Sequence, residues 1–459
     1  MTVLGTVFRL AVSLCTLNAN YDVINGLMRR SLKIHYNIVM GPTMSSVMWG
    51  AFCSTIFIFA FFGSLSFYWI SKVVSRRKGI IFCQLLFIFS SFLALWSYYD
   101  LFELLFFSHA ITGFSVGLGV SFLEISDSTT RRCLVKVAAA TAWISTVIGS
   151  VMASKFVLGS ELTWPFLYLF PAVFNMFCLT FYLGVYKETP VYLLSLAETS
   201  LAMESIKFYY ENSENHEENL EEMQRLHRES CNRLDFTLLE TLQDHVGRKY
   251  IILSGIIVIA IQFSILWPFT LFGTEIFLRF GHVDRSSSTF IVAIIFIMAT
   301  LCLPIGFRLS SIFSPRKLLI FSIACLSMIS MICSATIFVA ETQPPQSWPA
   351  LLLIVTFSLT LIVHSSLVEP LLSNGLIVIG ERRFQRAIFH FASNFTFLSA
   401  FLATLLFYPL QQAIGYGVYM IFTAIQLVAL GVIVRLHAKG TIAENNGETQ
   451  QADEENRTN

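Results

Sequence analysis

Long apolar stretches recur along almost the whole chain, and they constrain its fold more than any other feature. A helix needs roughly 20 apolar residues to cross the hydrocarbon core of a bilayer, and stretches of about this length follow one another with short polar breaks. Twelve of them are predicted to span a membrane: residues 4–25, 44–71, 79–98, 101–122, 137–158, 164–186, 250–278, 289–310, 317–340, 349–379, 387–409 and 414–435. Of the 459 residues, 55% are hydrophobic and only 13% are charged. A single soluble core cannot hide so much apolar surface, so we expect an all-α integral membrane protein whose solvent is the lipid bilayer.

One long polar segment divides the twelve stretches into two sets of six. Residues 187–249 contain acidic and basic side chains at helical spacing, which predicts a solvated helical linker. The expected organisation is therefore an N-terminal six-helix bundle at 1–186, the linker, and a C-terminal six-helix bundle at 250–436. Residues 437–459 lack apolar content, and we expect them to form a disordered tail.

The basic residues of the short breaks predict the orientation. Most lie in alternate breaks, on the side of the linker and the tail: Lys72, Arg76, Arg77, Lys78, Arg131, Arg132, Lys136, Arg308, Arg316, Lys317, Arg382, Arg383 and Arg386. Fewer lie on the opposite side: Arg29, Arg30, Lys33, Lys155, Arg279 and Arg285. Because cytoplasmic loops are enriched in Lys and Arg, both termini and the linker are predicted to be cytoplasmic, with the plasma membrane as the expected location. The first break on the opposite side, which contains Arg29, Arg30 and Lys33, is an exception to this bias of basic residues.

Several function classes are disfavoured by composition. The net charge is +1, which gives no support to a nucleic-acid partner. The nine cysteines are scattered, mostly within apolar runs, without the spacing of a metal site or a disulfide framework. The sequence has no metal-ligand cluster, no nucleophile and base pair, and no phosphate-binding glycine loop, and Gly117 and its neighbours are interpreted as helix packing. We therefore expect neither an enzyme nor a cofactor.

Charged motifs stand at equivalent helix ends. Arg76 and Arg77 follow the second stretch, Glu124 and Arg131 follow the fourth at a spacing of seven, and Glu188 begins a Glu-Thr-Pro segment after the sixth. Together they resemble the sugar porter branch of the major facilitator superfamily, which contains facilitative glucose transporters and proton–sugar symporters. That family carries Asp-or-Asn-Arg-x-Gly-Arg-Arg, Glu-x6-Arg and Pro-Glu-Ser-Pro-Arg at these places. The resemblance extends over nearly the whole chain and implies twelve helices in two bundles that alternate access to a central cavity.

The resemblance also implies a gate on the cytoplasmic side. Its charged residues would hold one state of the transport cycle: Arg76, Arg77, Glu124, Arg131, Glu188 and Arg383. The motif that contains Arg76 and Arg77 departs from the family pattern, because Lys72 stands in place of Asp or Asn and Ser75 in place of Gly. The charge pairing is therefore expected to be weaker or rewired.

The solute site implied by the family is only partly preserved. Gln262 lies in a segment that resembles Gln-Leu-Ser-Gly-Ile-Asn, in which Trp267 replaces the Asn, and Asn394 and Phe395 resemble Ser-Asn-Trp. Gln262 and Asn394 are candidate sugar contacts, and Trp267 and Phe395 are candidate stacking surfaces. Interhelical hydrogen bonding and plain packing are the alternatives. A polar partner left unmade in a dry site costs roughly 1–3 kcal/mol, so the site turns its substrate differently, binds a less polar one, or has stopped transporting.

Each ionisable residue inside a predicted span calls for a functional or structural explanation. Placing a charged side chain at the bilayer centre costs at least about 2.5–3.5 kcal/mol of insertion free energy. Asp22 follows a tyrosine, as in proton-coupled members of the family, where this Asp pairs with an Arg that corresponds here to His109. The resemblance thus implies proton coupling through Asp22 and His109. The alternative is a hydrated Asp near the outer mouth and a packed neutral His. Glu369 precedes Pro370 and is expected to face the cavity, where it would suit a cation or a proton, unless it has a basic partner. His364 is assigned to packing.

The predicted function is a secondary transporter that moves a hexose or a similar small polar solute by alternating access. Transport is facilitative or coupled to protons. A carrier of another solute, such as an organic ion, is one alternative, because related carriers share the same charged motifs. A non-transporting membrane sensor or scaffold is another, because the predicted pocket has lost polar contacts.

Overall fold

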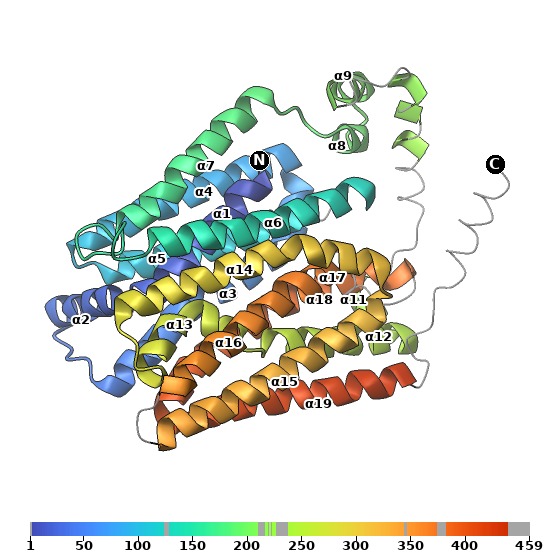
Figure 1. The fold of residues 1–459 in the computed structure, drawn as a ribbon. Coiled ribbons are helices and arrows are strands. Elements are labelled where there is room, and N and C mark those ends of the chain that lie inside the picture. The colour runs from blue at the N-terminus through green and yellow to red at the C-terminus, as the bar shows by residue number, and fades with distance from the viewer. Residues whose placement is uncertain are drawn as a thin grey trace.

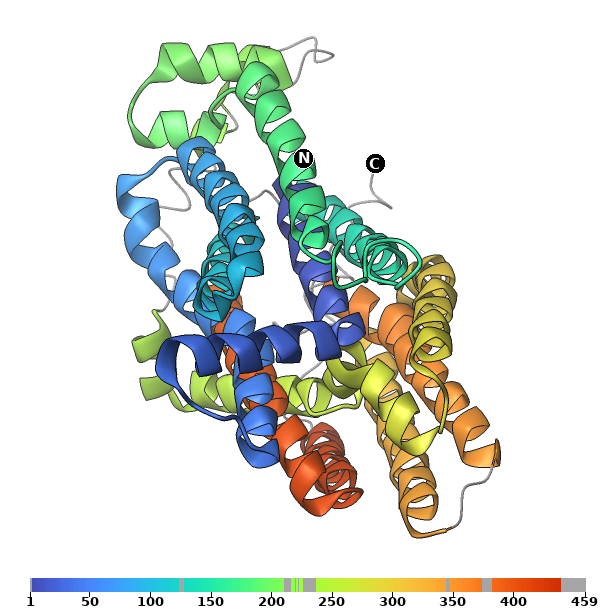
Figure 2. The same ribbon diagram turned by 90° about the vertical axis from the view of Figure 1, so that its left-hand side faces the viewer.

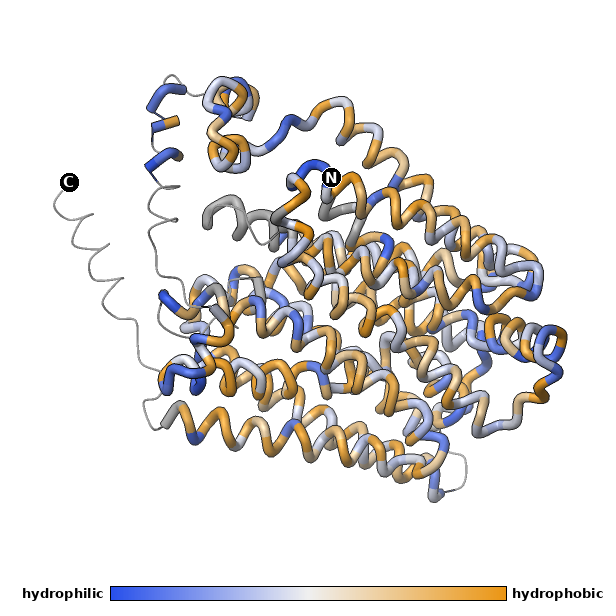
Figure 3. Tube along the Cα trace, turned by 180° about the vertical axis from the view of Figure 1, so that it is seen from behind, coloured by the Kyte–Doolittle hydropathy of each residue, from blue (hydrophilic) through white to orange (hydrophobic). Residues whose placement is uncertain are grey.

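The computed structural model describes residues 2–123, 128–209, 216–218, 220–221, 223–225, 237–343, 347–373 and 382–438. Over these ranges the secondary structure is helical, with no strand. Ten helices in the described ranges are long and apolar enough to span a membrane, and Val7–Ala19 and Lys136–Met152 are shorter apolar helices. Together they account for the twelve predicted spans, which confirms the all-α membrane fold. Figure 3 shows hydrophobic residues along the helices and hydrophilic residues gathered mainly near their ends.

Among the described residues, each half of the chain contributes six spans, and Figure 1 shows how they are arranged. Those of the N-terminal half are α1 (Thr2–Ala19), α3 (Pro42–Val73), α4 (Arg76–Trp96), α5 (Phe102–Leu123), α6 (Ser128–Met152) and α7 (Phe166–Val185). Those of the C-terminal half are α12 with α13 (His245–Gln262, Leu266–Phe280), α14 (Arg285–Ile312), α15 (Pro315–Thr342), α16 with α17 (Ser347–Val363, Glu369–Ser373), α18 (Gln385–Ile414) and α19 (Gly417–Ala438). The halves meet where α3 packs on α18, α6 on α14, and α1 on α13.

Helix α2 (Tyr21–Tyr36) runs across one end of the molecule rather than along the spans (Figure 2). The prediction that the first span continues to residue 25 was wrong, because α1 ends at Ala19. One side of α2 is apolar and buried through Ile24, Leu27 and Met28, whereas Arg29 and Arg30 are exposed. Such a helix lies on a surface, and it carries the basic residues that broke the charge bias. We call this end of the molecule the α2 face.

The opposite end, which we call the linker face, carries three short helices. They are α8 (Pro190–Ser195), α9 (Thr199–Tyr209) and α11 (Leu238–Gln243). They fall within the predicted helical linker, and further parts of that linker, like residues 439–459 of the predicted tail, lie outside the described residues. Lys187 forms an ion pair with Glu204, and this hydrogen bond lowers the pKa of the Glu204 carboxyl.

Helices α3 and α5 approach each other closely through glycine. A Cβ added to Gly113 would lie 2.2 Å from the carbonyl oxygen of Ile56, and one added to Gly117 would lie 1.9 Å from that of Ala60. Small residues let helix backbones approach in membranes, where lipid gives no hydrophobic drive to association. These contacts make the pair a rigid part of the N-terminal half.

Two spans of the C-terminal half are interrupted. One is broken at residues 263–265 between α12 and α13, and the other passes through a π-helical segment, η2 (His364–Val368), ahead of Pro370. Proline cannot donate a backbone hydrogen bond, and π segments often occur at functional positions. The Nε2 atom of His364 lies 2.9 Å from the hydroxyl of Ser264, so the two breaks are joined. His364 is therefore a hydrogen-bonded residue and not only a packing residue.

Candidate functional site

A small polar pocket lies where the two halves meet. Its volume open to a water-sized sphere is about 10 Å³, and it is lined by Cys15, Asn18 and Ala19 of α1, Ser150 of α6, Thr274 of α13, and Thr289 and Val292 of α14. Each of these lining residues is uncharged. The thiol of Cys15 donates to the carbonyl oxygen of Thr146 at 3.2 Å. A space of this size holds about one water molecule, so the halves must separate before a larger neutral polar solute can contact these hydroxyl and amide groups.

Asn18 joins the N-terminal half to the backbone of α13. Its Nδ2 atom donates to the carbonyl oxygens of Phe269 and Thr270 at 3.1 and 2.9 Å, and its Oδ1 atom accepts from the N–H of Thr274 at 2.9 Å. The regular helical partner of the Thr274 N–H is the carbonyl of Thr270, so the amide bridges a donor and an acceptor of the same helical turn. With its side chain only 3% exposed, Asn18 is a buried link between the halves.

An ion-pair triad lies further toward the α2 face. The Arg285 Nε atom lies 2.8 Å from the Asp22 carboxylate, and its NH2 atom lies 2.7 Å from the carboxylate of Glu275. The side chains of Arg285 and Glu275 are 15% and 19% exposed, and that of Asp22 is 61% exposed. The triad therefore connects α2 to α13 and α14 at the surface, beyond the buried Asn18 bridge.

Helices α3 and α18 pack closely on the same side of the molecule. A Cβ on Gly50 would lie 2.9 Å from the carbonyl oxygen of Leu405. The Tyr21 ring contacts the rings of Trp49 and Tyr408 at centroid distances of 4.9 and 5.8 Å. These contacts and the triad close the space between the halves toward the α2 face.

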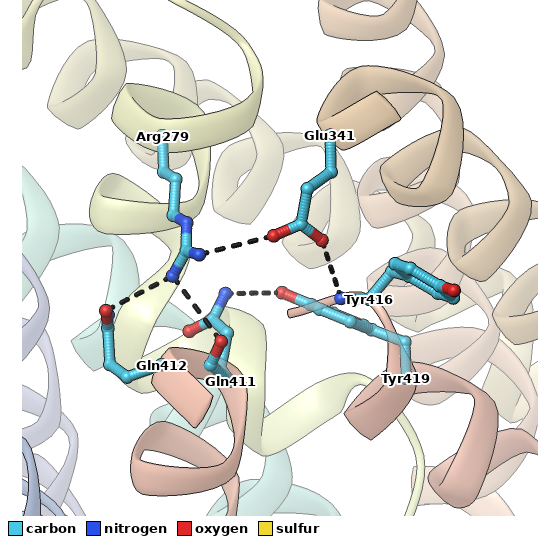
Figure 4. Close-up of polar contacts among 6 residues, drawn as sticks. All are labelled: Arg279, Glu341, Gln411, Gln412, Tyr416 and Tyr419. Carbon is cyan, nitrogen blue, oxygen red and sulfur yellow. Dashed lines mark hydrogen bonds and ion pairs between the residues drawn. The ribbon is translucent and has the colours of Figure 1, made fainter. Parts of the chain in front are cut away.

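A polar cluster fixes α13 to the rest of the C-terminal half near the α2 face (Figure 4). The Arg279 guanidinium donates to the carbonyl of Gln411, to the side chain of Gln412 and to the carboxylate of Glu341, at 3.4, 3.2 and 3.3 Å. The second carboxylate oxygen of Glu341 accepts from the N–H of Tyr416 at 2.9 Å. These groups belong to α13, α15, α18 and the residue that precedes α19, so the cluster holds one end of α13 to these elements.

The predicted pair Gln262 and Trp267 lies at the break between α12 and α13. The indole Nε1 of Trp267 donates to Oε1 of Gln262 at 2.5 Å, and the Trp267 ring meets the edge of Phe57 of α3 at a centroid distance of 4.6 Å. The structure thus brings these two candidates together, against the N-terminal half.

The predicted pair Asn394 and Phe395 lies on α18. Asn394 Nδ2 donates to the carbonyl of His390 at 2.8 Å, and its buried Oδ1 has no hydrogen-bond partner among the residues that the structure describes. The Phe395 ring stacks on Phe391 with centroids 5.3 Å apart. Glu369 is partly buried at the start of α17. None of these residues, nor the Gln262 pair, belongs to the lining of the pocket described above.

The structure does not bring the predicted proton-coupling residues together. Asp22 lies on α2 and pairs with Arg285, because the chain leaves the span before the Tyr-Asp motif. His109 is 1% exposed in α5, its Nδ1 lies 2.9 Å from the Leu105 carbonyl, and its ring packs on Phe52 with centroids 4.5 Å apart. The direct Asp22–His109 contact that the resemblance implied is replaced by these two separate environments.

The predicted gate residues lie at the linker face. The backbone N–H of Arg77 donates to the Glu188 carboxylate at 3.3 Å, and the Arg77 guanidinium donates to the Leu183 carbonyl at 3.2 Å. The Glu188 carboxylate is also within electrostatic range of Arg76. Arg383 places its guanidinium 4.5 Å from the ring centroid of the adjacent Phe384. Glu124 and the side chain of Arg131 lie outside the described residues.

The sequence reasoning missed the residues that join the halves. Asn18 stands in an apolar stretch, which was a usable signal, but an asparagine there fits any interhelical hydrogen bond. Arg285 was counted only as a loop cation, and Glu275 was assigned no role. Their pairing joins positions far apart in the chain and has no local signature.

Comparisons with known proteins agree with this architecture. The family model described as "Sugar (and other) transporter" matches residues 10–442. No curated protein sequence matches the chain. Among solved structures, a partially occluded inward-open form of the xylose transporter XylE from E. coli is similar at a TM-score of 0.70 and 13% identity, covering 95% of this chain and 99% of that one.

Two further structures extend the comparison. The proton:xylose symporter XylE of the major facilitator superfamily, bound to 6-bromo-6-deoxy-D-glucose, has a TM-score of 0.67 at 13% identity and covers 94% of this chain and 95% of that one. The nucleoside transporter NupG has a TM-score of 0.55 at 13% identity, with coverage of 95% and 100%. At such identities the likeness concerns the fold. Because the family model covers nearly the whole sequence, this chain belongs to the sugar (and other) transporter family of the major facilitator superfamily.

Proposed function

We propose that this chain carries a hexose or a similar small neutral polar solute across the membrane by alternating access. The observation that carries the proposal is the Asn18 bridge, which closes the contact between the halves toward the α2 face beside a lining of uncharged residues. The water-sized space there would widen to admit a solute when the halves separate. The hexose class is supported by XylE, a structure of which holds 6-bromo-6-deoxy-D-glucose. On this proposal the moving units are the bundles 1–186 and 250–436, joined by the linker 187–249.

The contacts between the halves suit a carrier that opens toward one side at a time. In this conformation the Asn18 bridge and the Asp22–Arg285–Glu275 triad hold the α2 face closed. Opening that face breaks them at little cost to α13, because the residues Leu266–Phe280 form a continuous helix whose backbone groups have helical partners. Rocking of the halves around a fixed midplane site then exchanges access.

Solute contacts are proposed at both sides of the interrupted span. Gln262 holds Trp267 in this conformation, and a sugar hydroxyl would replace the indole as its partner. Asn394 offers a buried Oδ1 that has no partner in the described ranges, with Phe395 beside it as a stacking surface. Glu369 is the candidate contact for a cationic solute or a proton.

Gating and coupling follow from the charged residues. We infer that Arg76, Arg77 and Glu188, with Glu124, Arg131 and Arg383, stabilise the closed linker face in the opposite state, as the family resemblance implies. The Asp22–Arg285 ion pair belongs to the closed α2 face, so loss of this pair in Asp22→Asn would favour opening of that face. Both termini are proposed to be cytoplasmic, and the plasma membrane is the proposed location.

Uptake assays test the proposal. Radiolabelled glucose, fructose and a panel of organic cations would be supplied to transporter-null cells with verified surface expression of the protein. Saturable hexose uptake supports the proposal, and cation uptake lost in Glu369→Gln supports the organic-ion alternative. Absence of any flux supports the sensor alternative. Equal hexose uptake at about pH 5.5 and about pH 7.5, in both the native protein and Asp22→Asn, excludes proton coupling through Asp22.

A further inference from the structure

The most unusual buried group in the molecule is Arg9 of α1. Its side chain is 1% exposed, and none of its three guanidinium nitrogens has a hydrogen-bond partner within the part of the chain that the structure describes. Arginine stays protonated in proteins, and an uncompensated charge inside a membrane protein is expensive and marks function more often than packing. A buried cation of this kind requires a partner.

The surroundings of Arg9 are polar along one face of α1. Its guanidinium carbon lies 5.2 Å from the centroid of the Tyr168 ring of α7, and the Tyr168 ring lies 5.8 Å from that of His109 of α5. One turn earlier, a Cβ on Gly5 would lie 2.6 Å from Asn175 of α7 and 2.9 Å from Gln84 of α4. These positions share a face because residues four apart in a helix are neighbours.

The unpaired atoms around Arg9 include an excess of donors. We call Arg9, Ser13, Gln84, His109, Tyr168 and Asn175 the Arg9 cluster. Over the part of the chain described, the hydroxyls of Ser13 and Tyr168, both ends of the Gln84 and Asn175 amides, and the Nε2 atom of His109 are buried without hydrogen-bond partners. None of these side chains carries a negative charge, whereas the guanidinium alone offers five N–H groups. The missing partner is therefore an acceptor that carries negative charge.

We propose that the Arg9 cluster binds a small inorganic anion of the size of chloride inside the N-terminal half. The guanidinium of Arg9 and the hydroxyl of Tyr168 supply its charged and neutral donors, and the amides of Gln84 and Asn175 turn their N–H groups toward it. This site is separate from the pocket between the halves, whose lining shares no residue with it. It does not depend on the identity of the transported solute.

Thermal unfolding of the purified full-length protein in detergent tests the proposal. The unfolding midpoint would be measured against sodium chloride concentration, with sodium gluconate keeping the ionic strength constant, since gluconate is too large for such a site. We expect a saturable rise of the midpoint with chloride in the native protein. Arg9→Gln should abolish this dependence, and Arg435→Gln, which removes an exposed arginine of α19, should leave it unchanged.

Direct retention of radioactive chloride by the purified native protein gives a second readout that needs no variant. Tyr168→Phe removes one neutral donor and should weaken the apparent chloride affinity about tenfold, as expected for loss of one good hydrogen bond to an ion. If Arg9→Gln does not fold, the native retention and Tyr168→Phe decide the question. Lack of saturable chloride dependence in the native protein would overturn the proposal, as would unchanged dependence in Arg9→Gln or Tyr168→Phe. No saturable chloride dependence in the native protein would mean that the cluster holds only water.

Discussion

Replacing Asn18 by alanine should open the α2 face. The change removes three buried hydrogen bonds between the halves, at 3.1, 2.9 and 2.9 Å. Each contributes about 0.5–1.5 kcal/mol net. Because the backbone groups of α13 have helical partners, they are not left unsatisfied, and we take the loss to the closed state as about 2 kcal/mol, in the lower part of the summed range. A change of this size shifts the ratio of closed to open molecules about thirtyfold toward open.

The native Cys15 thiol reports this shift. It lines the pocket beside Asn18 and is 2% exposed, so a reagent arriving from the α2 face reaches it only after that face opens. A membrane-impermeant maleimide would be applied to the outside of cells, where the proposed orientation places the α2 face. The rate of Cys15 modification should rise about thirtyfold in Asn18→Ala, and a Cys15→Ser background identifies the signal.

Asn25→Ala is a matched control. Asn25 is also buried and accepts a hydrogen bond from Ser45 at 3.0 Å, but both residues belong to the N-terminal half. Its loss should leave the Cys15 rate near the native value. If Asn18→Ala labels no faster than the native protein at equal surface expression, the Asn18 bridge does not hold the α2 face closed, and the reasoning fails.

Three further predictions concern the linker face and the packing of the helices. Glu188→Gln weakens the contact with the start of α4 and should change the maximal uptake rate up to about fivefold with little change in KM; an altered KM alone would contradict a gating role. Gly117→Ala should destabilise the protein by about 1–3 kcal/mol because its Cβ meets the backbone of α3, whereas Gly184→Ala, with nothing within 4 Å, should leave the thermal midpoint unchanged. Asp244 caps α12, and the backbone N–H of Gly247 lowers the pKa of its carboxyl. Its stabilising effect is therefore complete above the unfolded pKa of about 3.9 and is lost as the pH falls through the lower folded value. Asp244→Asn should reduce the midpoint at neutral pH and match the native protein in strong acid.

The spans were predictable because hydropathy sums over about 20 residues and needs no knowledge of contacts. The same sum failed at residues 20–25, where the apolar side of α2 continues the hydrophobic signal across a change of direction. The family resemblance then placed Asp22 in the membrane, whereas the structure places it at the surface with Arg285. A local motif cannot report where a helix ends relative to the bilayer.

The Arg9 cluster escaped prediction for a different reason. Arg9 stands near the beginning of the first apolar stretch, where a long basic side chain normally extends to the interface. Its burial arises from Tyr168 and His109, which lie on α7 and α5. The Gln84 and Asn175 amides likewise meet only through the close approach of α4 and α7 to Gly5. Sequence gives the residue types, but the convergence of four helices determines which of them face one another.

Helix α13 contacts both halves of the protein and follows a break in its span, as expected for a moving element of an alternating carrier. At one end it is tied to α15 and α18 through Arg279 (Figure 4), and along its length its backbone is hydrogen-bonded to Asn18. At its other end it follows the break at 263–265, where Ser264 contacts His364 at the second break. A segment held by both halves and preceded by a break moves as a unit, because packed interfaces switch between discrete arrangements rather than bending continuously. On the proposed cycle, release of Asn18 and of the Asp22–Arg285 pair therefore lets α13 turn about residues 263–265 together with the C-terminal half. The Ser264–His364 contact then couples this turn to the second interrupted span, which contains Glu369.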